Sequence, residues 1–190
     1  MSLLEISVVM PTYNRIDTLR EVLPTLLDQT LSATAYEIVI ADSRSTDGTA
    51  QYVEDLCQRE GERIRYVPGP YAGRGAARNA GIEAARGPVV MFTDADILAS
   101  RTLLERHATG HKEGANRRVA IVGCELQVRS LEDYRTQRDY PAARRPLHPP
   151  TRRRLSWLYF LTGNASVRRA DLLRVGSFDE QFTGYGHEDL

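Results

Sequence analysis

Short apolar runs alternate with amphipathic stretches along most of the chain. The runs are rich in β-branched residues and predict buried strands at 6–10, 36–41, 64–67, 88–93 and 119–124. Apolar positions with the helical period predict helices at 18–29 (capped by Asp17), at a stretch ending near 60, and at 75–85 and 100–113. A small-residue turn at 162–167 leads into another strand, and a brief helix is expected at 169–175. This alternation favours an α/β fold with a mostly parallel sheet and right-handed crossovers.

Polar or acidic residues follow three of the predicted strands. Thr12 and Tyr13 follow the first, Asp42 follows the second, and Asp94 and Asp96 follow the run at 88–93. Carboxyl ends of parallel strands meet at one edge, where open α/β sheets bind ligands, so we expect a single ligand crevice. If the chain stays extended, Asp94 and Asp96 face the same way. Two hard oxygen ligands suit Mg²⁺ or Mn²⁺ carrying a substrate diphosphate, and the alternative is a solvated acidic turn.

Length and composition are those of one soluble globular domain. The chain has 190 residues, 42% hydrophobic and 26% charged, which is enough for a single domain with a core. Its formal net charge of zero gives no bulk attraction to nucleic acid. Cys57 and Cys124 lack disulfide-framework or metal-site spacing, which favours a reducing compartment, the cytoplasm. The chain carries no signal peptide pattern and no apolar run of roughly 20 residues, so we expect no transmembrane segment.

The segment 144–154 is basic and rich in proline, which is typical of an irregular loop. It could form a flap that meets a diphosphate, an anionic acceptor or a membrane surface, or it could be a solvated loop. Apolar structure resumes directly after it, so no domain boundary is predicted there and 1–190 is treated as a single domain.

Two histidines lie four residues apart on the helix predicted at 100–113. His107 and His111 have the i, i+4 spacing of zinc ligands, but the sequence lacks the glutamate of a His-Glu-x-x-His motif. We therefore expect both side chains to lie on the solvated surface of that helix.

Six motifs occur in order along the chain, and together they resemble the inverting family 2 glycosyltransferases of the GT-A fold. They are Val-Val-Met-Pro-Thr-Tyr-Asn-Arg at 8–15, Asp-Ser-Arg-Ser-Thr-Asp-Gly-Thr at 42–49, Gly-Ala-Ala-Arg-Asn-Ala-Gly at 75–81, Asp-Ala-Asp at 94–96, Gly-Asn-Ala at 163–165 and Gly-His-Glu-Asp at 186–189. The resemblance covers 6–190 and implies a Rossmann-like nucleotide-binding sheet flanked by helices, with a mixed acceptor-side extension. It assigns 1–100 to the nucleotide-sugar-binding half and 101–190 to the acceptor-side half.

The resemblance also implies which residues hold the nucleoside. Pro11, Thr12, Tyr13 and Arg15 would line its pocket, and Asp42 would accept a hydrogen bond from the imide N–H of the base. That role suits uracil or thymine, because each carries one such donor.

Three further residues are assigned to the diphosphate, the sugar and the metal. Arg78 would project from its helix toward the nucleotide or diphosphate, although a salt bridge on the helix surface is the alternative. Asp94 would touch the ribose or the donor sugar, and Asp96 would coordinate Mn²⁺ or Mg²⁺. The metal would act as a Lewis acid on the leaving phosphate.

On the acceptor side, the resemblance implies that Gly163 and Asn164 help to bind the acceptor. Asp189 would take the proton from the acceptor hydroxyl, with Glu188 holding the acceptor or serving as the alternative base. The pair could instead simply begin a helix, where acids are favoured. Family members continue well past this pair, whereas this chain stops at Leu190, so we expect it to be truncated at its C-terminus.

The activity implied is metal-assisted transfer of a sugar from a UDP-sugar or related donor to a hydroxyl group, with inversion. The acceptor would be a saccharide, a lipid-linked molecule or another alcohol in cell-wall or exopolysaccharide biosynthesis, with possible contact at the inner face of the membrane. One alternative, a nucleotidyltransferase, normally has a glycine-rich, lysine-bearing loop after its first strand, which 11–15 lacks. The other is a non-catalytic nucleotide-binding domain, which hydrolysis or transfer of a donor would exclude.

Overall fold

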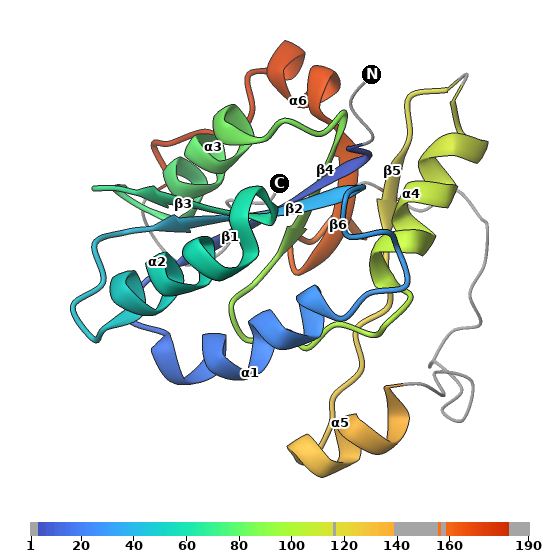
Figure 1. Ribbon diagram of the computed structural model, residues 1–190. Coiled ribbons are helices and arrows are strands. Elements are labelled where there is room, and N and C mark those ends of the chain that lie inside the picture. The colour runs from blue at the N-terminus through green and yellow to red at the C-terminus, as the bar shows by residue number, and fades with distance from the viewer. Residues whose placement is uncertain (1–3, 116, 139–155, 157–158, 183–190) are drawn as a thin grey trace.

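The computed structural model describes residues 4–115, 117–138, 156 and 159–182, and its centre is a six-stranded mixed sheet (Figure 1). The sheet order is β3-β2-β1-β4-β6-β5. In chain order the elements are β1 (Ile6–Thr12), α1 (Ile16–Leu27), β2 (Tyr36–Asp42), α2 (Thr49–Glu60), the 3₁₀ helix η1 (Gly61–Arg63), β3 (Ile64–Pro68), α3 (Arg74–Ala84), β4 (Val89–Thr93), α4 (Leu103–Glu113), β5 (Ala120–Val122), α5 (Leu131–Gln137), β6 (Asn164–Arg168) and α6 (Arg169–Val175).

The predicted α/β architecture is confirmed, and so is the mixed extension. β1, β2, β3 and β4 run parallel to one another, whereas β6 runs antiparallel to both β4 and β5. The brief helix expected at 169–175 is α6. The strand expected at 119–124 is shorter, since β5 ends at Val122. The described helices include none that is long and apolar enough to cross a membrane.

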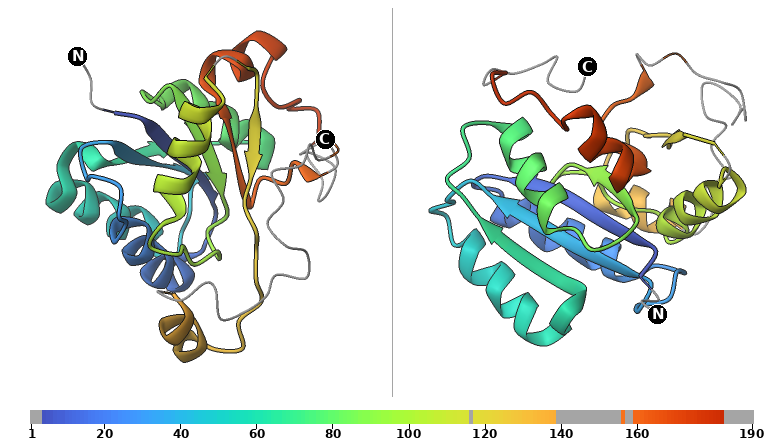
Figure 2. Two further views of the ribbon diagram at one scale, coloured as in Figure 1. Left: turned by 90° about the vertical axis from the view of Figure 1, so that its right-hand side faces the viewer. Right: turned by 90° about the horizontal axis from the view of Figure 1, so that it is seen from above.

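Helices cover both faces of the sheet, and the core has two layers. On one face, alternate residues of β1 (Ile6, Val8 and Met10) pack in a cluster with apolar residues of α1, α2 and α4. On the other face, Val9 packs in a second cluster with residues of α3 and α6, which lie over the same face of the sheet in the view from above (Figure 2). The central strands are therefore apolar on both sides, as expected for a buried parallel sheet.

Helix α1 begins earlier than the sequence suggests, and Asp17 does not cap it. The N-cap is Arg15, and Asp17 lies within the first turn. A loop more than thirty residues away supplies the missing acceptor, because Asp47 Oδ2 accepts a hydrogen bond from the Ile16 N–H at 3.0 Å. The prediction was wrong because it considered only neighbouring residues as caps.

Two sequence-based predictions lie outside the described residues. These are the basic loop at 144–154, with the membrane contact it suggested, and the acidic pair Glu188 and Asp189.

Helix α3 approaches β1 closely at Gly81. A methyl group added at this position would overlap the Val9 side chain, which belongs to the core of the sheet. Glycine here allows the helix to lie directly on the strand, and this contact sets the height of the whole helix above the sheet.

We expect Gly81→Ala to destabilise the fold by about 1–3 kcal/mol, the usual cost of overpacking a filled core. Urea unfolding followed by circular dichroism measures the change. In a Val9→Ala background the new methyl group has space, so the loss caused by Gly81→Ala should shrink. Equal losses in the two backgrounds would show that the contact between Gly81 and Val9 does not set the distance of α3 from the sheet.

Candidate active site

The strand ends that the sequence singles out meet at one edge of the sheet. Thr12 and Asp42 are partners in the parallel register of β1 and β2. β6 starts at this edge because it runs antiparallel to β4, and Thr93 therefore pairs with Asn164. The turn that precedes β6 thus lies beside Asp94, and the predicted convergence at a single edge is confirmed.

Two loops at this edge are joined by side-chain hydrogen bonds. The Asn14 side chain accepts a hydrogen bond from the Thr46 N–H at 2.7 Å, and the Asn14 N–H donates to Ser45 Oγ at 2.8 Å. Asn14 adopts φ 49°, a left-handed conformation that asparagine tolerates. The loop after β1 is therefore fixed against the loop after β2.

The residues predicted to hold the nucleoside occupy different depths of this edge. Pro11 and Thr12 are buried within β1, whereas Tyr13 is 59% exposed and Arg15 is also open to solvent. Tyr13 and Arg15 are therefore the members of this set that a ligand can reach from solvent.

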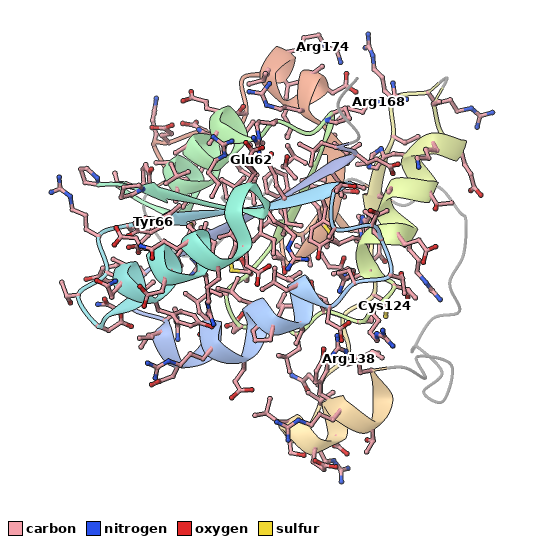
Figure 3. All side chains as sticks on the ribbon, viewed as in Figure 1. Glu62, Tyr66, Cys124, Arg138, Arg168 and Arg174 are labelled. Atoms are coloured by element: carbon pink, nitrogen blue, oxygen red, sulfur yellow. The ribbon has the colours of Figure 1, made fainter. Side chains whose placement is uncertain are left out.

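Asp42 lies at the expected strand end, but its carboxylate is fully buried and already bonded. It accepts hydrogen bonds from the Ser45 hydroxyl at 2.5 Å and from the Tyr66 hydroxyl at 2.7 Å. Burial raises the pKa of Tyr66, and the hydrogen bond to Asp42 and its negative charge raise it further. A base imide could bond to Asp42 only if it displaced one of these donors. Tyr66, on β3 (Figure 3), was missed by the sequence analysis.

Arg78 is neither directed outward nor part of a surface salt bridge. It is 1% exposed, and its Nη2 donates to Asp94 Oδ1 at 3.3 Å. Its guanidinium also lies over the ring of Phe178, 5.6 Å from the centroid. The surface alternative was wrong because α3 lies flat on the sheet and carries this side chain inward.

The chain turns within the Asp-Ala-Asp motif. The Ile97 N–H donates to the Asp94 carbonyl oxygen at 3.3 Å, so the segment is not extended and the condition for the predicted alignment of the two carboxylates is not met. Asp94 is half-buried against Arg78, whereas Asp96 is exposed. The two carboxylates therefore have different surroundings.

A third carboxylate, Glu125, lies beside this pair and was also missed. Partial burial of its carboxyl raises its pKa, and the negative charges of Asp94 and Asp96 raise it further. Its Oε1 lies against Gly163, in the space that a side chain at that position would occupy. Glu125 follows a predicted strand just as Asp42 and Asp94 do, so the same strand-end rule would have found it.

These carboxylates suit a divalent cation that arrives with a diphosphate. Among the described residues, no three His, Cys, Asp or Glu side chains gather as a metal cage. Mg²⁺ is commonly held by one or two carboxylates together with substrate phosphates, so a complete protein cage is not required. The mutual repulsion that raises the Glu125 pKa is also relieved by a cation.

Asn164 is buried, and its side chain turns into the protein. Its Oδ1 bonds to His107 Nε2 at 3.0 Å, and its Nδ2 donates to the Cys124 carbonyl oxygen at 3.4 Å. A side chain at Gly123 would overlap the Asn164 amide, so glycine leaves room for it. Gly163 is buried too. Of this group, Glu125 rather than Gly163 or Asn164 is open to solvent.

His107 and His111 are buried, so the prediction of a solvated surface was wrong. They are 3% and 5% exposed, and both bond to Ser166 Oγ, His107 through Nδ1 at 2.7 Å and His111 through Nε2 at 2.9 Å. The helix that carries them packs on β6, which the sequence could not show.

One arrangement of protons satisfies this network. Because Asn164 Oδ1 can only accept, His107 Nε2 carries the proton, and the neutral ring then accepts at Nδ1 from the Ser166 hydroxyl. Ser166 in turn accepts from His111 Nε2. Burial lowers the pKa of His107 to about 4 and also lowers the pKa of His111, so both rings are neutral at pH 7.

The fold and the site together define an α/β domain of the GT-A type with carboxylates at the edge of its sheet. The model of the family "Glycosyl transferase family 2" matches residues 7–176, and the chain belongs to that family. This membership argues against the nucleotidyltransferase alternative.

Several known proteins are similar to this chain. Validoxylamine A glucosyltransferase of Streptomyces hygroscopicus subsp. jinggangensis is 33% identical over 211 residues, covering 97% of this chain and 49% of that protein. S. aureus TarS 1–349 in complex with UDP has a TM-score of 0.75 at 23% identity, covering 98% of this chain and 53% of that chain. PcManGT of Pyrobaculum calidifontis, a mannosyltransferase in complex with GDP-Man and Mn²⁺, has a TM-score of 0.70 at 26% identity, covering 97% and 49%. The chain spans about half the length of the curated relatives it matches first.

The histidine network predicts a loss of stability in acid. The unfolded chain binds a proton at His107 near pH 6.5, whereas the folded protein resists it until about pH 4. The stabilisation is therefore complete above pH 6.5 and decreases by about 3 kcal/mol as the pH falls to 4. The variant His107→Gln has no imidazole to titrate, so its stability should fall by about 3 kcal/mol less than that of the wild type between pH 6.5 and pH 4. Urea unfolding at several pH values measures both proteins, and parallel curves would show that His107 is not a buried neutral ring.

Proposed function

We propose that this chain carries the donor site and acceptor-side residues of an inverting glycosyltransferase that moves a sugar from a UDP-sugar, or a related nucleotide diphosphate sugar, to an acceptor hydroxyl. The observation that carries the proposal is the position of Asp94 directly after β4, with Asp96 exposed two residues on, at the edge where β1 and β2 also end. Similar proteins were solved with UDP, with UDP-GlcNAc and with GDP-Man and Mn²⁺, which supports a donor of this chemical class.

The donor nucleotide is held by the loops after β1 and β2. The exposed Tyr13 and Arg15 contact the nucleoside from the open side, while Pro11 and Thr12 form the base of the pocket. Asp42 selects the base together with its present donors, because the Tyr66 or Ser45 hydroxyl yields its place when the carboxylate accepts an imide N–H. We propose uracil because it offers one such donor.

A divalent metal would bind the diphosphate of the donor, and the buried Arg78 would support the metal site through Asp94. Asp96, exposed at the edge, would hold Mn²⁺ or Mg²⁺, with Asp94 beside it. When bound, the ion supplies Lewis acidity at the leaving phosphate. Arg78 neutralises Asp94 from below and keeps this carboxylate in place, so that it can receive the ribose or donor sugar.

The acceptor approaches from the side of β5 and β6. Glu125 is the carboxylate of this side that faces solvent, and it accepts a hydrogen bond from the acceptor, in place of the buried Asn164. From its position in the sequence we propose Asp189 as the general base, with Glu188 as the alternative. The base takes the hydroxyl proton as the acceptor oxygen attacks the anomeric carbon and the bond to the diphosphate breaks on the opposite face, which inverts that carbon.

We further propose that the protein acts in the cytoplasm, on a saccharide or other hydroxyl acceptor of cell-wall or exopolysaccharide synthesis. Cys57 and Cys124 are free thiols, and a reducing compartment keeps them so. A relative 31% identical over 103 residues is named poly(ribitol-phosphate) beta-N-acetylglucosaminyltransferase TarS, which supports a polymer acceptor.

Asp96→Asn should remove most of the metal dependence of donor binding. We expect the gain in UDP affinity on adding Mn²⁺ to fall by at least about tenfold, since even residues that merely support a metal ligand contribute that much. Calorimetric titration of UDP with and without Mn²⁺ measures this gain. Asp55→Asn, an exposed change on α2, is the matched control. An unchanged gain in Asp96→Asn would place the metal elsewhere.

Asp189→Asn should leave UDP affinity unchanged and lower sugar transfer by about 10²–10⁴, the usual contribution of a positioned base. Asparagine keeps the shape of the side chain but cannot take the proton. Transfer from a radiolabelled UDP-sugar to a panel of acceptors measures the rate, beside the UDP dissociation constant. If Glu188→Gln is inactive and Asp189→Asn is not, the two roles are exchanged.

A further inference from the structure

The side chain of Asn79 holds the backbone of a distant residue by two hydrogen bonds. Its Oδ1 accepts from the Phe178 N–H at 2.9 Å, and its Nδ2 donates to the Phe178 carbonyl oxygen, also at 2.9 Å. Asn79 lies in α3, whereas Phe178 follows α6, so the contact joins segments 99 residues apart in sequence. We call this pair of bonds the Asn79 clamp. A third bond, from Nδ2 to Glu180 Oε1 at 2.8 Å, lies at the surface.

The clamp fixes an aromatic ring that is partly buried and packs against the core. The Phe178 ring packs edge-to-face on Phe92, with centroids 5.3 Å apart and an interplanar angle of 86°. Phe92 belongs to β4 and comes two residues before Asp94. Phe178 is therefore held from two sides, by Asn79 through its backbone and by Phe92 through its ring.

The Phe178 ring lies against the guanidinium of Arg78. The guanidinium is over the Phe178 ring on one side and donates to Asp94 at 3.3 Å on the other. A buried guanidinium is stable only where its charge is compensated, and a ring face adds a favourable interaction of its own. If Phe178 moves, Arg78 loses its contact with the ring, and its alignment with Asp94 changes.

We propose that Asn79 is a positioning residue for donor binding, which it supports through Phe178 and Arg78 and without touching the donor. The inference rests on the proposed function, because it takes Asp94 as part of the site for a nucleotide diphosphate sugar and its metal. The clamp gives α3 two neighbouring polar residues with distinct tasks: Arg78 bonds to Asp94, and Asn79 holds the ring that aligns Arg78.

The test is a comparison of Asn79→Leu with the wild-type chain. Leucine has a similar size but makes neither bond to Phe178. Glu180→Ala is the matched control, because it removes only the third, surface bond of Asn79 and leaves the clamp intact. The readouts are the dissociation constant of UDP with Mn²⁺, measured well below the unfolding temperature, and the thermal midpoint of each variant.

We expect Asn79→Leu to weaken UDP–Mn²⁺ binding about five- to tenfold, roughly the net contribution of one ordinary hydrogen bond, because only part of the lost clamp energy reaches the donor through Arg78. Glu180→Ala should bind as the wild type does. Phe178→Leu, which removes the ring and leaves its backbone for the clamp, should weaken binding similarly. In the double variant the two effects should not add, since both act through the same ring.

The possible outcomes separate the two proposals. A wild-type chain that binds no UDP with Mn²⁺ overturns the proposed function and this inference with it. Suppose that the wild type binds UDP with Mn²⁺ and that Asn79→Leu binds it equally well but has a lowered thermal midpoint. The clamp then contributes to stability and not to donor binding, and this inference alone fails. If Asn79→Leu does not fold, Phe178→Leu decides the question: unchanged binding in that variant overturns the inference.

Discussion

The close contact of α3 with β1 at Gly81 is the constraint on which the site depends. Gly81 and Arg78 are three residues apart and so lie on the same face of the helix. The approach that places Gly81 on Val9 therefore carries Arg78 into the core beneath Asp94. Asn79, one position further round the helix, is directed to the segment after α6. A helix held higher above the sheet would separate all of these contacts at once.

Buried polar groups connect neighbouring segments by hydrogen bonds at both edges of the sheet, where the parallel strands begin and where they end. At the amino end, the buried Glu37 carboxylate of β2 accepts hydrogen bonds from the Ser7 hydroxyl at 2.6 Å and from the Arg86 N–H at 2.7 Å. Burial alone would raise the pKa of Glu37, but these bonds outweigh it and the pKa is lowered. Toward the other end, His107 and Asn164 join α4 to the start of β6 through neutral groups. The network at the start of β6 is thus uncharged at pH 7, unlike the pair of Arg78 and Asp94.

The sequence predicted what depends on local pattern, and it failed where a contact between distant segments decides. Alternating strands and helices indicated the parallel sheet and the edge where Asp42 and Asp94 meet. The hydrogen bond of Tyr66 to Asp42 depends on the register of β3, which sequence alone does not determine. The burial of His107 depends on the packing of α4 against β6. Glu125 was within reach, because it follows a strand in the same way as the predicted site residues.

The order of the strands in space also dictates an order of events in folding. β5 precedes β6 in the chain, yet it joins the sheet through β6, and Ala120 pairs with Val167. While the chain emerges from the ribosome, β1 to β4 can assemble from segments already made, but β5 must wait until β6 has been made before it can pair. Pairings between distant segments form slowly because a long loop must close first. The edge formed by β1, β2 and β4 can therefore be in place while the strand that leads to Glu125 is still unpaired.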